Sequence, residues 1–360
     1  MENLPAGNLS RHAHGGATRR EAELNRRRLI QAAVLLIIGL LILYGLIRTV
    51  HPGEVAAAIR GATPGWVALG MLSSVGFIAL RSWRWQIILA ASVADAPLTD
   101  AAAVTAIGFA VNSVSPFKLG ELLRIGAIAQ RLRIGVGEAS ATVVLERILD
   151  VLALLVLAVG AALVSGQSSN GARVWGGLAA LASVSVAAGI VAYVMVLNRE
   201  RTMSIAAHLA ARLPTRLRTP ALNAADSILR GLALLRSPGR FIATGLLSLA
   251  VWIVPILGLA AYFRSVSGEL GPVTLFLAVT LFVITQAISV TPASVGTYEG
   301  LFVLVLGAFG AGPASVLTAA AVIAHVGGIV TLLLVGAVGA LWLRLNRKPL
   351  PVGLQRSVPS

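Results

Sequence analysis

Residues 113–121 read SVSPFKLGE, and residues 289–299 read SVTPASVGTYE. Each stretch carries a proline, a glycine four residues later and then a glutamate, and each interrupts sequence that is otherwise apolar. Proline and glycine end or bend helices, and irregular backbone at membrane depth is tolerated only where protein or water satisfies its polar groups. The pattern therefore predicts two re-entrant helical hairpins. Their breaks are expected at Pro116, Gly120, Pro292 and Gly296.

The composition is that of a membrane protein. Hydrophobic residues make up 57% of the chain, charged residues make up 12%, and the mean hydropathy is +0.87. A helix needs about 20 apolar residues to cross a hydrocarbon layer of about 30 Å. Continuous apolar runs favour helices over a β-barrel, whose strands alternate. The sequence predicts an all-α, polytopic helical membrane protein with about six full spans plus the two hairpins. The spans are expected near residues 29–48, 65–91, 141–164, 174–197, 241–262 and 314–343.

A single transmembrane domain is expected to occupy residues 29–347. The hairpin motifs fall in similar halves, at about 101–164 and 276–343. An odd number of spans separates the two hairpins, so the halves would form an inverted repeat, as in many transporters. Residues 1–28, which are polar and rich in arginine, and residues 348–360, which are rich in proline, are predicted to be disordered tails.

The net charge of +15 is explained by membrane topology. If the N-terminal tail is cytoplasmic, alternating spans place most of the 29 Lys and Arg residues on that same side. The exceptions on the opposite side are Arg48, Arg60, Arg173 and Arg264. This is the positive-inside pattern. We expect a multi-pass protein of a bacterial inner membrane with both termini cytoplasmic, and no nucleic-acid partner.

A polar segment at residues 198–240 forms the longest predicted cytoplasmic loop. Apolar residues recur in it at helical spacing among arginines: Leu222, Ala225, Ile228, Leu229, Leu232 and Leu235. One interpretation is a basic amphipathic helix that lies on the anionic cytoplasmic leaflet. The other is a solvated connector between the two halves. The loop is too short for a catalytic domain.

Glu299 is the leading candidate for a functional side chain. It lies within VGTYEGLF, residues 295–302, with no cation near it in the sequence. A carboxylate in such surroundings must pair, bind a proton or face water, because burying it unpaired is costly. We predict that it contacts substrate or couples movement to protons; the alternative is a structural ion pair. Its possible partners from the other half are Arg81, Arg84, Arg124 and Arg147.

The first hairpin carries a charged helical face close after Asn112. Lys118, Glu121 and Arg124 are spaced three apart and therefore share one broad face. Arg124 and Lys118 are predicted to hold a phosphate, the arginine by a bidentate contact and the lysine as a point charge. The alternative for both cations is snorkelling to the interface.

Another charged group lies near the start of the predicted span at 141–164. Glu146 and Asp150 are four residues apart, and Arg147 can pair with Asp150 at a spacing of three. Charges inside a membrane usually face a bundle interior or a cavity. The group is therefore interpreted either as part of the site or as a local charge-neutral cluster.

Two further features have structural interpretations. The segment Arg81-Ser82-Trp83-Arg84-Trp85 is typical of an interfacial belt, and His325 beside two glycines is typical of close helix packing. The chain has no cysteine and no P-loop, HExxH or GxSxG motif. No catalytic residue, cofactor or metal site is therefore predicted.

Taken in order, these motifs resemble the transmembrane domain of the lysylphosphatidylglycerol synthase family, also called flippase-like integral membrane proteins. The resemblance covers about residues 30–343. It rests on Asn112-x3-Pro116-x3-Gly120-Glu121-x2-Arg124, Arg81-x2-Arg84-Trp85, Glu146-Arg147 and Pro292-x3-Gly296-x2-Glu299. Lys118 stands where an arginine would be more usual, so a bidentate contact is not expected there.

The resemblance implies a membrane-embedded domain that handles lipids, in some members by moving them between leaflets. Bifunctional members add a soluble C-terminal domain that aminoacylates phosphatidylglycerol. This sequence stops soon after its last predicted span, so we expect a stand-alone member without synthase activity.

The leading functional hypothesis is a non-enzymatic lipid translocase with a polar cavity near the midplane of the bilayer. Its expected partners are membrane lipids with an anionic or phosphate-bearing head group. One alternative is an intramembrane lipid-modifying enzyme that uses Glu121 or Glu299 as general base. Another is a scaffold subunit that recruits a lipid-biosynthesis enzyme through the 198–240 loop. The predicted head-group site consists of Asn112, Lys118, Glu121, Arg124, Glu146, Arg147 and Glu299.

Overall fold

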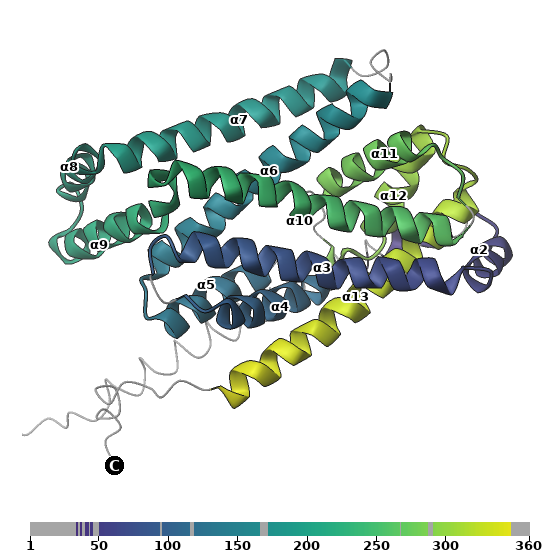
Figure 1. Cartoon of the computed structure of the whole chain (residues 1–360), viewed down its shortest axis with the longest axis horizontal. Helices are drawn as coiled ribbons and strands as arrows, with labels where there is room; N and C mark the ends of the chain where they lie inside the picture. The colour runs from purple at the N-terminus through teal and green to yellow at the C-terminus, as the bar shows by residue number, and fades with distance from the viewer. Residues whose placement is uncertain are drawn as a thin grey trace, which may run out of the picture.

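The computed structural model describes residues 50–93, 96–115, 119–165, 172–266, 268–286 and 291–346, with a few positions between 34 and 45. These residues form helices and their connections, and none of them lies in a strand (Figure 1). The all-α prediction is confirmed. The helices are α2 (Pro52–Arg60), α3 (Pro64–Leu89), α4 (Leu98–Val114), α5 (Leu119–Leu132), α6 (Val136–Ser165), α7 (Ala172–Leu197), α8 (Arg199–Ala210), α9 (Thr215–Gly231), η2 (Ala233–Arg236), α10 (Pro238–Ser265), α11 (Pro272–Thr285), η4 (Pro292–Ser294), α12 (Thr297–Ala308) and α13 (Ala314–Leu345).

In the part of the chain that the structure describes, four helices, α3, α6, α10 and α13, are long and apolar enough to cross a membrane. Their apolar stretches contain 26 to 32 residues, or about 39 to 48 Å of helix. They coincide with four of the six predicted spans. Helix α7 occupies the fifth, at 174–197, and its described apolar part is Val186–Leu197. The sixth, near 29–48, falls largely outside the described residues, as do the predicted tails at 1–28 and 348–360.

Helices α4 and α5 pack against each other as the two arms of the first hairpin. Gly120, in the first turn of α5, permits their close approach, because a Cβ there would lie 1.9 Å from the carbonyl oxygen of Gly108. The Gly120 N–H also donates to Asn112 Oδ1 at 2.8 Å. Gly120 is therefore a helix-contact position in the first turn of α5. Pro116 and Lys118 lie outside the described residues.

Helices α11 and α12 form the second pair of short apolar arms. In the connection between them Pro292 begins η4, and Ala293 and Ser294 have φ angles of 51° and 55°. Non-glycine residues rarely adopt this left-handed backbone, which costs on the order of 1–3 kcal/mol per residue. Gly296 has φ 77° and precedes α12, where glycine avoids that cost. The chain thus leaves the α-helix between Thr285 and Thr297, in the segment that contains Pro292 and Gly296.

The first hairpin packs against the long helix α3 through α4, whereas the second packs against α6, α10 and α13. In Figure 1, α4 and α5 accompany the C-terminal part of α3, whereas α11 and α12 lie toward its N-terminal end. The break of the second hairpin, η4, contacts α4. The end of α4 and the break of the second hairpin therefore meet inside the helical bundle.

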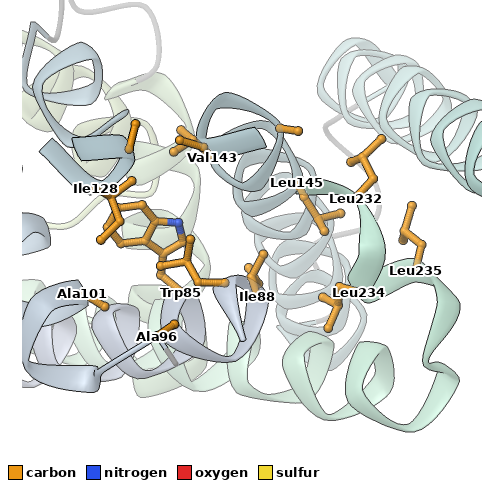
Figure 2. Packing of buried hydrophobic residues seen from close by; sticks show 14 of the residues in the cluster. Trp85, Ile88, Ala96, Ala101, Ile128, Val143, Leu145, Leu232, Leu234 and Leu235 are labelled. Carbon is orange, nitrogen blue, oxygen red and sulfur yellow. The ribbon is translucent and has the colours of Figure 1, made fainter. Parts of the chain in front are cut away.

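Two apolar cores hold the bundle together. The first surrounds the buried indole of Trp85, which lies near Ala101 and Ile128 (Figure 2) and joins α3 to α4, α5 and α6. The second lies where α10, α11, α12 and α13 meet. There the buried rings of Phe282 and Phe302 pack edge to face, with their centroids 5.0 Å apart.

The segment at 198–240 forms α8, α9, η2 and the start of α10. Leu229 and Leu232 are buried, and α9 packs against α6. Most of the predicted apolar face thus packs against the protein itself, and Ile228 is its exposed member. The exposed face is charged: Asp226 pairs with Arg199 and Arg230. The hydrogen bond from Arg199, supported by the charge of Arg230, holds the pKa of Asp226 below its ordinary value.

Candidate functional site

Three arginines from α3 and α5 meet two carboxylates of α6 in the interior. Glu146 lies 2.8 Å from Arg124, 3.1 Å from Arg84 and 3.2 Å from Arg81. Asp150 lies 2.7 Å from both Arg81 and Arg84. The three arginine side chains have no exposed surface, and the two carboxylates have at most 4%. Buried charges are stable only when they are paired, so this cluster fixes α3, α5 and α6 against one another.

Arg147 and Glu121 form the solvent-accessible edge of the same cluster. Their side chains pair with each other and are 38% and 22% exposed. Arg147 also lies 3.4 Å from Asp150, as its spacing predicts. Four arginines thus face three carboxylates among the described residues, which leaves one positive charge in excess. We refer to these residues as the ion network: Arg81, Arg84, Glu121, Arg124, Glu146, Arg147 and Asp150.

Aromatic rings cover the buried part of the ion network. The guanidinium of Arg124 lies 4.2 Å from the ring centroid of Trp85, and that of Arg81 lies 5.0 Å from that of Phe109. Such cation–π contacts are strongest where the cation is desolvated. Trp252 of α10 donates from Nε1 to Asp150 at 3.0 Å. The interior arginines therefore belong to the packed core and do not line an open binding site.

A separate pocket of about 350 Å³ lies between the two hairpins. Asn112 and Ser113, at the end of α4, form one part of its wall, and Ala293 and Ser294 of η4 form another. Helices α3, α10, α11, α12 and α13 complete it. Among the described residues that line it there is no lysine, arginine or carboxylate. The polar side chains of this hairpin pocket are Ser73, Ser74, Asn112, Ser113, Tyr262, Gln286, Ser294, Tyr298 and His325.

Glu299 lies directly behind the wall of the hairpin pocket. Its Oε1 is 2.7 Å from His325 Nδ1, and its Oε2 accepts the N–H of Gly296 at 2.8 Å. The imidazole of His325 stacks on the ring of Tyr298, with 4.3 Å between centroids. His325 lines the pocket and therefore lies between the pocket and the Glu299 carboxylate. The partner of Glu299 is thus His325, and not one of the four arginines considered under the alternative of a structural ion pair.

Two buried polar groups face the hairpin pocket without a partner. Tyr262 is 3% exposed and is held between Gly70 of α3 and Gly327 of α13, where an added Cβ would lie 2.6 to 2.7 Å from the tyrosine. Its hydroxyl and Gln286 Nε2 have no hydrogen-bond partner in the part of the chain that the structure describes. An unpaired buried polar group costs about 1–3 kcal/mol. A polar ligand or water in the pocket would remove that cost.

A layer of aromatic side chains separates the hairpin pocket from the ion network. Phe77, Phe109 and Trp252 line the pocket, and the ring of Phe77 lies 5.3 Å from that of Phe109 and 5.8 Å from that of Trp252. On the other side of the same layer, Phe109 contacts Arg81 and Trp252 binds Asp150. The two polar regions are thus one aromatic side chain apart.

The structure divides the predicted head-group residues between these regions. Asn112 lines the hairpin pocket and Glu299 lies behind it, whereas Glu121, Arg124, Glu146 and Arg147 belong to the ion network. Lys118 lies outside the described residues.

A protein-family model described as the lysylphosphatidylglycerol synthase TM region matches residues 30–349. The chain belongs to this family. A relative named UPF0104 membrane protein, from Methanothermobacter thermautotrophicus, is 30% identical over 131 residues, which are 36% of this chain and 39% of that protein. The match thus spans about two fifths of the relative's length. These findings confirm the family resemblance and establish a multi-pass membrane protein of a lipid-related family.

For several residues of this family member, the sequence alone does not decide whether the side chain is buried or which side chain it contacts. Arg81 and Arg84 are fully buried, so their interpretation as an interfacial belt is wrong. Two charges three residues apart inside an apolar helix are themselves a signal for an internal network. His325 is also an ionisable residue within a long apolar helix. Such a residue usually pairs with another polar side chain, which here is Glu299. Tyr262 and Gln286 lie in no motif, and only the packing of distant helices shows that they line the same pocket.

Proposed function

We propose that this chain moves a lipid or lipid-linked molecule between the two leaflets, with the head group passing through the hairpin pocket. The observation that carries the proposal is a pocket bounded by both hairpins that contains unpaired buried polar groups. A polar head group needs such donors and acceptors to cross the hydrocarbon layer. Its acyl chains would stay in the surrounding lipid.

The two hairpins would act as the halves of an inverted repeat. Rocking of one half against the other would open the pocket to each face in turn. The strained backbone at Ala293 and Ser294 supports this mechanism, because strain of this kind is often stored where a segment switches. The contact between η4 and α4 lies where the two halves would move. By the positive-inside pattern, the first hairpin would enter from the cytoplasmic face.

The lining of the pocket favours a neutral or cationic head-group moiety. Its described wall combines the aromatic faces of Phe109, Trp252 and Tyr298 with hydroxyl and amide groups. Aromatic faces attract cations, and Glu299 supplies a carboxylate behind His325. A phosphate would instead be bound at Arg147, the half-exposed cation of a network that has one positive charge in excess.

Substitution of Glu299 by glutamine is expected to preserve the fold and slow translocation at least about tenfold, a change of ~1.4 kcal/mol. The amide oxygen can still accept the Gly296 N–H, but the side chain no longer provides a charge beside His325. The rate is measured in proteoliposomes by dithionite reduction of fluorescent lipids that differ in head group. Glu269→Gln, at an exposed position before α11, is the matched control and should translocate like the wild type. Equal rates for Glu299→Gln and wild type would remove the Glu299–His325 pair from the mechanism.

A lipid-modifying enzyme is the second candidate, because Glu299 and His325 form an acid–base pair beside a pocket. This alternative requires a covalently altered lipid after incubation with the protein, which mass spectrometry detects. Head-group movement with chemically unchanged lipid would support the translocase.

A further inference from the structure

A second cavity, of about 400 Å³, lies between α6, α7 and α10. It shares no lining residue with the hairpin pocket among the described residues. Helix α7 packs along α6, and α10 follows on the other side of this groove (Figure 1). Helix η2 closes one end through Leu235. We call this cavity the α7 groove.

The α7 groove is apolar. Leu145 and Ile148 of α6 form its floor, and Ile190 of α7 and Phe241 of α10 form its sides. Tyr193 supplies the one side-chain polar atom among the described residues that line it. Gly189 of α7 also lines the groove, and a Cβ built there would touch Ile148 of the floor at 3.9 Å without a clash. Within a bilayer, such a groove suits a hydrocarbon chain better than water or a polar ligand.

Basic side chains lie at the end of the groove formed by η2 and the start of α10. Arg236 follows the lining residue Leu235, and Arg240 precedes the lining residue Phe241. Both arginines are exposed, and Arg236 donates to the carbonyl oxygen of Val196 at 3.4 Å, at the end of α7. Residues 231–265 contain no aspartate or glutamate. The end of the groove therefore carries positive charge that no acid of the same segment neutralises.

The geometry points to a bound phospholipid with an anionic head group, taken from the surrounding bilayer. One acyl chain fills the α7 groove, and the phosphate binds to Arg236 and Arg240. Arginine is suited to bind a phosphate because its planar guanidinium group donates two parallel hydrogen bonds to the phosphate oxygens. The lipid completes the packing between α7 and α10 and so holds the outer helix on the bundle. This site is independent of the proposed translocation pathway.

The test uses the delipidated full-length protein in detergent, with phosphatidylserine or phosphatidylcholine of identical chains added back. Thermal stability and native mass spectrometry measure stabilisation and retained lipid. Phosphatidylserine should raise the melting temperature of the wild type, and phosphatidylcholine should have a much smaller effect. Arg240→Gln should raise the phosphatidylserine concentration needed for half of the shift by about fivefold, since each cation near anionic lipid contributes about 1 kcal/mol.

Gly189→Leu fills the groove and should abolish both the phosphatidylserine-dependent shift and the retained lipid. Gly245→Leu is the matched control, because this α10 glycine lies outside the groove and an added Cβ meets nothing within 4 Å. Ile190→Trp is a second filling variant in case Gly189→Leu does not fold. Stabilisation of the filled variants equal to that of the wild type would overturn the proposal. Equal effects of the two lipids would overturn the assignment of an anionic head group.

Discussion

Glu146→Gln should destabilise the folded protein by about 3–5 kcal/mol, the usual effect of removing one partner from a buried ion pair. Glu146 is the shared partner of Arg81, Arg84 and Arg124, and all four side chains lie in the interior. Glutamine keeps the shape but removes the charge that compensates these cations. For a protein of this size the melting temperature in detergent should fall by roughly 4–7 °C.

The matched control for this prediction is Glu54→Gln, at an exposed carboxylate of α2, which should melt within about 2 °C of the wild type. The double variant Glu146→Gln, Arg124→Met should be less destabilised than the sum of its two single variants, because it removes a charge of each sign. Melting of Glu146→Gln at the wild-type temperature would show that the ion network does not hold α3, α5 and α6 together.

Filling the hairpin pocket from α13 should stop translocation while leaving the fold intact. Gly328 lines the pocket, and a Cβ built there meets no heavy atom within 4 Å. A larger side chain therefore enters open space. Gly328→Ala should translocate like the wild type, Gly328→Leu more slowly, and Gly328→Phe at the level of protein-free vesicles. The measurement is the proteoliposome assay, with size-exclusion chromatography of each variant.

Gly160→Phe provides the matched control for the filled pocket. Gly160 is an exposed glycine of α6, and an added Cβ there also meets no heavy atom within 4 Å. This variant should fold and translocate normally. Full translocation by a correctly folded Gly328→Phe variant would mean that the head group takes another route.

The main features of the fold could be predicted because membrane helices are encoded locally. A long apolar run defines a span without reference to the rest of the chain, so four spans were located near their observed positions. Pro292 and Gly296 also indicated a break, since their backbone restrictions do not depend on neighbours. Gly120 was harder to interpret. A glycine serves equally at a break and at a close helix contact, and only the position of Gly108 distinguishes the two.

The site could be predicted only in part, because pairing between distant helices is not encoded locally. Glu299 was identified as a residue that needs a partner, but its spacing could not show that His325, far along the chain, would provide it. The local sequence around Arg81 and Arg84 is equally compatible with a membrane interface and with a buried ion network. Their burial depends on Glu146 and Asp150 of another helix, which only the tertiary packing brings near.

Alternating access requires that the hairpin pocket be reached from both faces of the membrane. Because the chain contains no cysteine, a single introduced cysteine reports on one position without background. Ser294→Cys, in the pocket wall, is treated with a membrane-impermeant thiol reagent in right-side-out and in inverted membrane vesicles. Ser248→Cys, which replaces a buried serine bound to Arg84, is the control and should not react. Alternating access predicts modification of Ser294→Cys from both faces, whereas modification from one face only, or from neither, would contradict it.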